Sequence, residues 1–201
     1  MPEDHMDKLY NSPNPLVKYA HMNRLERIYG LLPSNIVNRK ILDAGCGEGH
    51  LIERLYRKNS QNTYFGIYVT EIALVKARER CPYAEFRKED ILKTRFPEGF
   101  FDLVICTEVL EHIQDYQSAL QELKRILKTG GYLIITFPNE LLWTMARFLL
   151  RRRPVRVPDH VNSFRPKEIK SLMGMDLSAI ESLPFGLPFV ISLGCLIKFQ
   201  K

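Results

Sequence analysis

Three glycines alternate with other residues directly after a short apolar run that ends in an aspartate. The stretch reads ILDAGCGEGH and covers residues 41–50. Glycines permit positive φ and let backbone amides approach a ligand with no Cβ in the way. The spacing is GxGxG, not the dinucleotide pattern GxGxxG, no GK[ST] is present, and acidic Glu48 lies where phosphate would bind. The loop predicts a nucleoside ligand with little or no phosphate, although a tight turn without a ligand could use the same glycines.

Two histidines could supply a base, because imidazole titrates near neutral pH. His112 ends the stretch EVLEH, and His160 lies in PDHVNSF directly after Asp159. Each could instead be structural. Glu111 and His112 could cap the following helix, and Asp159 and His160 could hold a loop in place.

Apolar periodicity indicates the elements that position these residues. Expected helices cover 14–32, 50–58, 71–81, 115–128 and 140–153, with Thr129-Gly130-Gly131 ending the fourth, and expected strands cover 40–44, 63–67, 84–87, 100–106 and 132–137. Alternating strands and helices indicate parallel βαβ units with helices on both faces of an open α/β sheet. The last two strands, 177–182 and 189–199, are separated by PFGLP, too short for a helical crossover. We therefore expect an antiparallel hairpin at one edge.

Length and composition favour one ordinary globular domain. The 201 residues can bury a sizeable core, and 45% of them are hydrophobic and 26% charged. The net charge of +6 is too small to indicate nucleic acid by itself. No apolar stretch is long enough for a transmembrane helix, and the first ten residues, MPEDHMDKLY, do not resemble a secretory signal. The four cysteines form no CxxC, which favours reduced thiols in the cytoplasm and no zinc site.

The motif LDAGCGEG resembles the first motif of the class I S-adenosylmethionine-dependent methyltransferases. Further motifs follow in that family's order: Asp90-Ile91, FDLVICTEVLEH (101–112) and LKTGGYLIITFPN (127–139). The likeness covers roughly residues 38–140 and is greatest to the small-molecule branch that includes quinone-ring O-methyltransferases. It implies a Rossmann-like fold, mostly parallel with an antiparallel C-terminal edge hairpin. It also implies S-adenosyl-L-methionine as cofactor and S-adenosyl-L-homocysteine as product.

The resemblance further implies a cofactor site. Asp43 and the amides of residues 45–49 would hold the methionine end, Asp90 would accept from the adenine amine, and Ile91 would lie against the ring. Thr107 and Glu108 would lie near the sulfonium. The full predicted cofactor set is Asp43, Gly45, Cys46, Gly47, Gly49, Tyr68, Val69, Glu71, Asp90, Ile91, Thr107 and Glu108, with no metal site. Asp90 could alternatively cap a turn in EDILKT.

Tyr68 departs from the family pattern, because the second strand usually ends there in an acid that accepts both ribose hydroxyls. A phenol cannot accept from two hydroxyls as a carboxylate does. Losing such a charge-assisted pair costs about 1.5–3 kcal/mol. Three interpretations stay open. Glu71 could reach back to the ribose, cofactor binding could be weak until substrate or a lid completes the site, or the protein could have lost methyl transfer.

In this family the segment after the fifth strand builds the acceptor pocket. We therefore expect His160 to be the base or an acceptor contact, and His112 to be part of the cleft wall. The stretch ELLWTMARFLLRRR (140–153) is an unusually apolar helix that ends in arginines, and Arg156 continues the basic run. It could be a core helix, or a lid or interfacial helix with its apolar face toward lipid or an apolar acceptor. It could also dock RNA, although no aromatic RNA-binding signature accompanies it.

We therefore predict one methyltransferase domain over residues 1–201. Its parts are an N-terminal helical lid (1–35), a cofactor-binding core (36–139), an acceptor-side insertion (140–175) and a C-terminal hairpin (176–201). The expected activity is methyl transfer to a small, apolar acceptor at oxygen, in the cytoplasm or at a membrane surface, with nucleic acid not expected as a partner. The alternatives are an RNA or protein methyltransferase that docks through residues 151–156, and a non-catalytic nucleoside-binding module.

Overall fold

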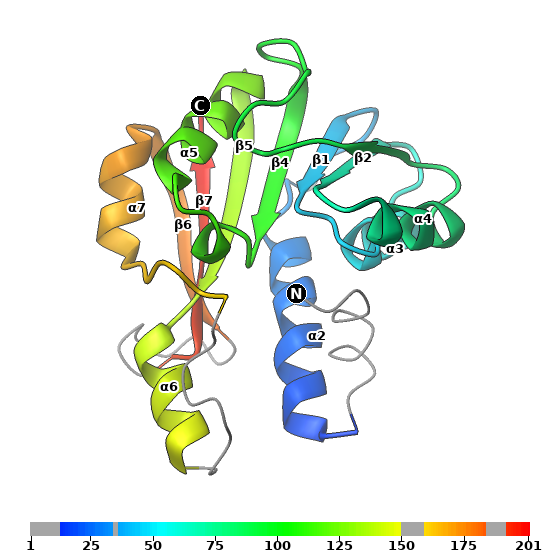
Figure 1. Ribbon diagram of the computed structural model, residues 1–201. Helices are drawn as coiled ribbons and strands as arrows, with labels where there is room; N and C mark the ends of the chain where they lie inside the picture. The colour runs from blue at the N-terminus through cyan, green and yellow to red at the C-terminus, as the bar shows by residue number, and fades with distance from the viewer. Residues whose placement is uncertain (1–12, 34–35, 150–158, 184–191) are drawn as a thin grey trace.

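The computed structural model describes residues 13–33, 36–149, 159–183 and 192–201. These residues form a seven-stranded sheet with the order β3-β2-β1-β4-β5-β7-β6 (Figure 1). The strands are β1 (Lys40–Ala44), β2 (Thr63–Tyr68), β3 (Glu85–Lys88), β4 (Phe101–Thr107), β5 (Leu127–Pro138), β6 (Asp176–Leu183) and β7 (Gly194–Gln200). The first five strands pair in parallel, and β7 runs antiparallel between β5 and β6. The predicted open sheet with an antiparallel C-terminal hairpin is confirmed.

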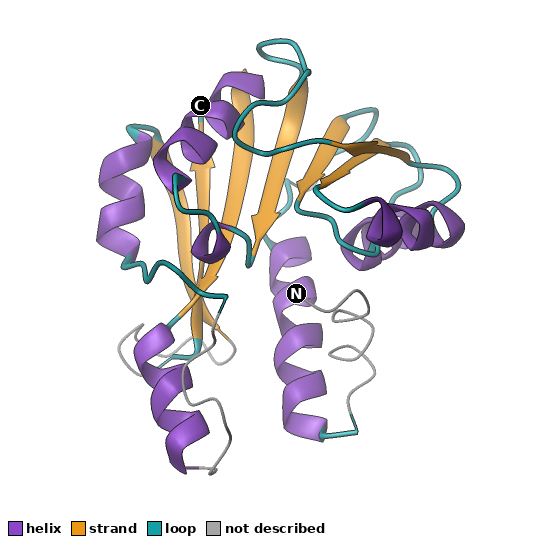
Figure 2. Ribbon diagram, viewed as in Figure 1, coloured by secondary structure: helices purple, strands orange, loops and turns teal. Residues whose placement is uncertain are grey.

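Helices cover both faces of the sheet, as predicted (Figure 2). They are α2 (Pro15–Gly30), α3 (His50–Lys58), α4 (Glu71–Arg80), α5 (Tyr116–Ile126), α6 (Glu140–Leu149) and α7 (Pro166–Met173), with a short 3-10 helix, η1 (Leu110–His112), after β4. The helices α2 and α6 extend beyond the carboxyl end of β4 (Figure 1). They therefore flank the edge at which open α/β sheets bind ligands.

Successive strand residues face opposite helical layers, because side chains alternate along a strand. In β1, Leu42 packs in one buried cluster with Leu120 of α5 and Ile169 of α7. Its neighbour Ile41 packs in a second cluster, which includes Ile28 of α2. All of these side chains are buried. The sheet is thus covered on both faces, as parallel strands require.

The N-terminal helix is held mainly through its second half. Leu25 and Ile28 are buried, whereas Tyr19 is 47% exposed. At the helix end, the Lys198 Nζ of β7 donates to the Leu31 carbonyl at 2.8 Å, across 167 residues of sequence. Burial lowers the pKa of Lys198. Helix α2 therefore depends on the C-terminal strand for part of its anchorage.

One predicted boundary is wrong, because Thr129-Gly130-Gly131 does not end a helix. The helix α5 stops at Ile126, and Leu127 already has extended backbone and pairs with Phe101 of β4. The glycines therefore lie inside β5. Leu127 is fully buried in the core, and this burial outweighs the glycine signal for the end of a helix. A Cβ on Gly131 would also lie 3.0 Å from the Asp102 carbonyl oxygen, so the glycine permits the close strand pairing.

Two predicted elements extend outside the described residues. The helix expected over 140–153 is described to Leu149, and the strand expected over 189–199 is described from Gly194 to Gln200. The sequence analysis does not predict α7, although its signals are present. Pro166 opens this helix, and Gly174 ends it in the left-handed conformation.

The four cysteines are buried and free, without disulfides. Within the described ranges, no helix combines the length and apolar character needed to cross a membrane.

A buried glutamate fastens α5 to the loop that follows β3. The Glu122 carboxylate accepts hydrogen bonds from the Thr94 amide at 2.8 Å and the Thr94 hydroxyl at 2.7 Å. It also accepts from Arg125 at 2.7 Å through Nε and Nη2. The Arg125 hydrogen bond and the Thr94 donors lower the pKa of Glu122 to about 2.

Replacing Glu122 by Gln should therefore lower the melting temperature at neutral pH. A carboxyl whose folded-state pKa lies below its ordinary value of 4.5 stabilises the fold above that value, and this contribution is lost as the pH falls from 4.5 toward about 2. The deficit of Glu122→Gln relative to wild type should accordingly shrink across this window. Thermal unfolding across a pH series measures this deficit, and Glu79→Gln at an exposed position is the control. A deficit that does not change with pH would contradict this account.

Candidate functional site

The predicted motifs meet at one edge of the sheet. In β1, Asp43 pairs with Gly66 of β2 on one side and with Ile105 of β4 on the other. Because these strands are parallel, the segments that follow them leave the sheet side by side. Tyr68 and Thr107, at the ends of β2 and β4, therefore flank the loop that follows β1.

The three glycines adopt positive φ angles, at 93° for Gly45, 50° for Gly47 and 82° for Gly49. A Cβ on Gly45 would lie 2.2 Å from Cγ2 of Val109, which follows β4. A Cβ on Gly49 would lie 3.3 Å from the Ala77 side chain of α4. The first glycine thus allows two strand-end loops to touch, and the third allows α4 to approach the start of α3.

Part of the loop's hydrogen-bonding capacity is used internally. The amides of Gly45 and Cys46 both donate to the Ile67 carbonyl, at 2.9 and 3.0 Å, and the Gly49 amide donates to the Cys46 carbonyl at 3.0 Å. Among the described residues, no backbone carbonyl accepts from the Gly47 amide. This amide is therefore a donor that the loop can offer to a ligand.

The Glu48 side chain turns toward α4 and does not face a phosphate position. Its carboxylate is 2% exposed. It forms an ion pair with Lys76 at 2.9 Å and lies 3.6 Å from His50 Nε2. The case against a phosphate ligand therefore rests on the glycine spacing and not on this charge.

Asp43 is a buried carboxyl group that lacks a cation among the described residues. It is 2% exposed, and no group in the described part of the chain forms a hydrogen bond with its Oδ1. Burial raises its pKa to about 7. A positively charged ligand group at this place would stabilise the ionised form. The residue thus fits a ligand ammonium, which is the role that the family resemblance gives it.

The predicted ribose side stays a prediction. Tyr68 is half-buried, and burial raises its pKa. Glu71 forms an ion pair with Arg78 of the same helix at 2.5 Å, so its carboxylate is engaged along α4. Val69 is 57% exposed beside them. Tyr68 accordingly has no carboxylate bound to it in the described structure.

The predicted adenine side consists of Asp90 and Ile91 after β3. The Asp90 Oδ1 accepts from the Leu92 amide at 2.9 Å, which is the turn-capping arrangement considered from the sequence. Asp90 is exposed and Ile91 is buried. The second Asp90 oxygen is not part of this turn, so capping does not exclude a ligand contact.

Glu108 connects the end of β4 to the N-terminal helix. It has a φ of 53°, unusual for a residue with a side chain, and its amide donates to the Thr136 carbonyl of β5 at 3.1 Å. Its Oε1 accepts from the Thr136 hydroxyl at 3.1 Å, and its Oε2 lies 3.2 Å from Nη1 of Arg24. Arg24 is 7% exposed. An ion pair between buried Arg24 and half-buried Glu108 therefore holds α2 beside the site, next to half-buried Thr107.

The next glutamate lies deeper still. Glu111 of η1 is 1% exposed, and neither carboxylate oxygen has a hydrogen-bond partner among the described residues. Burial, and then the neighbouring Glu108, raise its pKa well above the ordinary value. A desolvated carboxyl beside another is stable mainly in its protonated form.

The two predicted histidines come together. Their ring centroids are 4.7 Å apart at an interplanar angle of 79°. His112 Nδ1 lies 2.9 Å from the Asp159 carbonyl oxygen and so donates to it, while burial lowers the pKa of His112. His160 Nδ1 contacts the carboxylate of Glu140, which is 7% exposed. Sequence reasoning missed Glu140, because only the fold brings it to His160.

Backbone contacts fix His160 in this place. The amides of Val161 and Asn162 donate to the Glu111 carbonyl at 2.8 and 3.1 Å. The Asn162 side-chain amide donates to the Ile113 carbonyl at 2.6 Å. Residues 159–162 are thus bound to η1 and the residue after it.

Three side chains of this cluster could share a cation. Donor atoms of Glu111, His112 and His160 lie within 4.8 Å of one another. The expectation of a site without metal stays a prediction.

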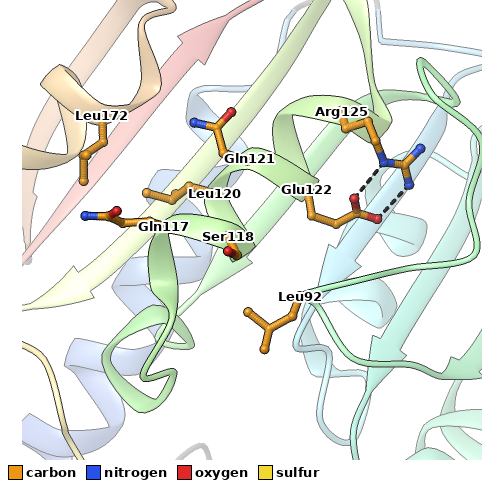
Figure 3. Close-up of a pocket in the computed structure, with 8 residues that line it drawn as sticks. All are labelled: Leu92, Gln117, Ser118, Leu120, Gln121, Glu122, Arg125 and Leu172. Atoms are coloured by element: carbon orange, nitrogen blue, oxygen red, sulfur yellow. Dashed lines mark hydrogen bonds and ion pairs between the residues drawn. The ribbon is translucent and has the colours of Figure 1, made fainter.

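A cavity of about 450 Å³ lies elsewhere, along the outer side of α5. Its lining residues are Leu92, Gln117, Ser118, Leu120, Gln121, Glu122, Arg125 and Leu172 (Figure 3). None of the predicted site residues lines it. The candidate site is therefore the strand-end edge and not this cavity.

Comparison with known proteins identifies the same region. A family model described as "Methyltransferase domain" matches residues 42–135. The chain is 28% identical over 190 residues to a ubiquinone biosynthesis O-methyltransferase of Methylococcus capsulatus. The alignment covers 86% of this chain and 78% of that protein. It is 33% identical over 144 residues to the protein of the same name from Alkalilimnicola ehrlichii, covering 65% of this chain and 57% of that protein. The chain thus spans little more than half of the second relative.

The fold has a similar counterpart among solved structures. A SAM dependent methyltransferase from Aquifex aeolicus superposes with a TM-score of 0.72 at 17% identity, covering 99% of this chain and 98% of that chain. The likeness at this identity concerns the fold.

Gly45→Ala should destabilise the protein more than Gly130→Ala. Both glycines have positive φ, which costs a residue with a Cβ about 1–2 kcal/mol. Only at Gly45 would the Cβ also collide with Val109, whereas nothing lies within 4 Å of a Cβ at Gly130. Overpacking should add about 1–3 kcal/mol to the loss at Gly45. Chemical denaturation measures both variants, and equal losses would mean that the loop can move away from Val109 freely.

Proposed function

Because the chain belongs to the class I S-adenosylmethionine-dependent methyltransferases, we propose that it transfers a methyl group from this cofactor to an oxygen atom of a small, apolar acceptor. The observation that carries the proposal is the cluster of strand-end side chains. In this proposal Asp43 and the glycine loop would bind the cofactor, and His160 with Glu140 would face the acceptor. The names of the two relatives, both O-methyltransferases, support oxygen as the methylated atom.

The residues present fit the cofactor chemically. S-adenosylmethionine supplies an electrophilic methyl group on a sulfonium and also carries an ammonium and a carboxylate. Asp43 is a buried carboxyl without a cation among the described residues and suits the ammonium. The Gly47 amide suits the carboxylate.

On the acceptor side, His160 could accept the proton of a hydroxyl group. Glu140 contacts His160 Nδ1, so a neutral His160 has its lone pair on Nε2. There it would take the acceptor's hydroxyl proton while the oxygen forms its bond to the methyl carbon. When bound, the cofactor would supply the methyl group, and its sulfur would keep the electrons of the carbon–sulfur bond. The His160 proton returns to water after the product leaves. Alignment of the two reactants supplies much of the remaining acceleration.

The helix α6 supports an apolar acceptor and contact with a membrane surface. Leu141 is 69% exposed, Met145 50% and Phe148 68%, and their spacing of four and three residues places them on one face. This exposure disfavours a core role for that face of the helix. In the sequence, Arg151, Arg152 and Arg153 follow directly, outside the described residues. An apolar helix face next to a basic run is typical of binding to an anionic lipid surface.

Calorimetry with S-adenosylmethionine should detect binding to the wild type in the micromolar range. Asp43→Asn should weaken it about ten- to a hundred-fold, since a charge-assisted contact with the ammonium is worth about 1.5–3 kcal/mol. Tyr68→Asp should strengthen it, because a carboxylate can accept from both ribose hydroxyls. Binding restored only in Tyr68→Asp would mean that the natural chain has lost its ribose contact. Unchanged affinity in Asp43→Asn would refute the placement of the site.

With S-adenosylmethionine present, the protein should convert long-chain phenols to their O-methyl ethers, detected by mass spectrometry. When the phenol is embedded in vesicles of phosphatidylglycerol, Leu141→Ser with Phe148→Ser should reduce the rate at least severalfold. The same variant should act normally on a short, soluble phenol, because α6 would no longer be needed for access to the acceptor.

The matched control replaces Ile72 and Val75 by Ser, because these α4 residues are 49% and 47% exposed. Equal losses in both double variants would contradict a specific role for α6. The absence of O-methyl ethers, together with salt-sensitive RNA binding, would favour the nucleic-acid alternative.

A further inference from the structure

We propose that Glu140 is the positioning residue of the site, holding His160 in the tautomer that carries its proton on Nδ1. The proposal deepens the proposed function and rests on it, because it explains how His160 can present a free Nε2 to an acceptor hydroxyl. The pair joins two segments that the sequence separates by 20 residues.

The chemistry of the contact sets the direction of the hydrogen bond. The Glu140 carboxylate contacts Nδ1 of His160, and the two side chains are 9% and 14% exposed. An ionised carboxylate can only accept, so Nδ1 must donate. A neutral imidazole has a single ring proton, and its Nε2 then carries the lone pair.

The backbone of Glu140 is fixed relative to the sheet. Asn139, which ends the connection from β5, donates its amide to the Leu193 carbonyl at 2.8 Å. Its carbonyl accepts from the Trp143 amide at 3.0 Å, which begins the hydrogen bonding of α6. Glu140 is the first residue of this helix, where the helix dipole favours a negative charge. The carboxylate is therefore held at a defined place beside β5.

His160 is fixed from the other side. His112 packs edge-on against its ring, with centroids 4.7 Å apart, and the Asp159 carbonyl binds His112 Nδ1. The following two residues are bound through their amides to the Glu111 carbonyl. With the ring confined by His112 and by the backbone, Glu140 decides which nitrogen carries the proton. His112 has its Nδ1 engaged by the Asp159 carbonyl and contacts His160 through its ring.

Nitrogen NMR of histidine-labelled protein, treated with a chelator to remove cations, tests the assignment without an acceptor. In the wild type, neutral His160 should show the Nδ1–H tautomer. In Glu140→Gln the side-chain amide can donate to Nδ1, so the signals should change to the Nε2–H tautomer. Glu140→Asp keeps a carboxylate and should keep the wild-type tautomer. Glu168→Gln is the matched control, because Glu168 of α7 accepts from the Tyr116 hydroxyl of α5 at 3.0 Å and not from a histidine.

In methyl transfer, Glu140→Gln should lower kcat roughly a hundred-fold, the usual contribution of a well-placed base, with S-adenosylmethionine affinity unchanged within about twofold. An unchanged His160 tautomer in a folded Glu140→Gln would overturn the inference, whatever the activity. A wild type that binds the cofactor but methylates no hydroxyl, with the tautomer change still present, would overturn the proposed function and leave the positioning by Glu140 supported. Thermal unfolding of each variant shows that it is folded.

Discussion

Carboxyl groups withdrawn from water dominate the edge of the sheet where the strands end. Each buried carboxylate costs several kcal/mol of lost hydration, so it needs a cation, a proton or a ligand. Half-buried Glu108 forms an ion pair with Arg24, and buried Glu140 accepts a hydrogen bond from His160. Burial raises the pKa of Asp43 to about 7 and the pKa of Glu111 well above its ordinary value, which favours the neutral, protonated form of each carboxyl. A ligand ammonium beside Asp43 would stabilise the ionised form of that carboxyl, and S-adenosylmethionine carries such a group.

Two sets of contacts hold the segments that cover the edge. The helix α2 comes from the start of the described chain, yet Arg24 brings it to the end of β4. Residues 159–162 come from far along the chain, yet their amides bind the carbonyl of Glu111. Both segments supply what the strand ends lack, either a positive charge or hydrogen bonds. The site is therefore formed by the sheet edge together with two segments bound to it, the helix α2 and residues 159–162.

Local patterns allowed much of the fold to be predicted. The strand over residues 40–44 and the helix over 50–58 are confirmed to the residue, because a short apolar run between polar and glycine signals fixes both ends. The same kind of reasoning failed at Gly130, where burial of Leu127 outweighed a glycine signal. The contact of Glu140 with His160 could not be read from the sequence, since it depends on the path of the chain between them. The cofactor residues, by contrast, lie in motifs that are local.

The hydrogen bond between Lys198 and the Leu31 carbonyl has a consequence for the order of folding. It joins positions 167 residues apart. Closing so long a loop costs conformational entropy, and this cost must be offset before the contact can stabilise the fold. The first half of the sheet can assemble from neighbouring βαβ units, whose contacts are short in sequence. Complete docking of α2 must wait until β7 is in the sheet. The covering of the site thus forms late, and its opening is a smaller event than unfolding of the sheet beneath it.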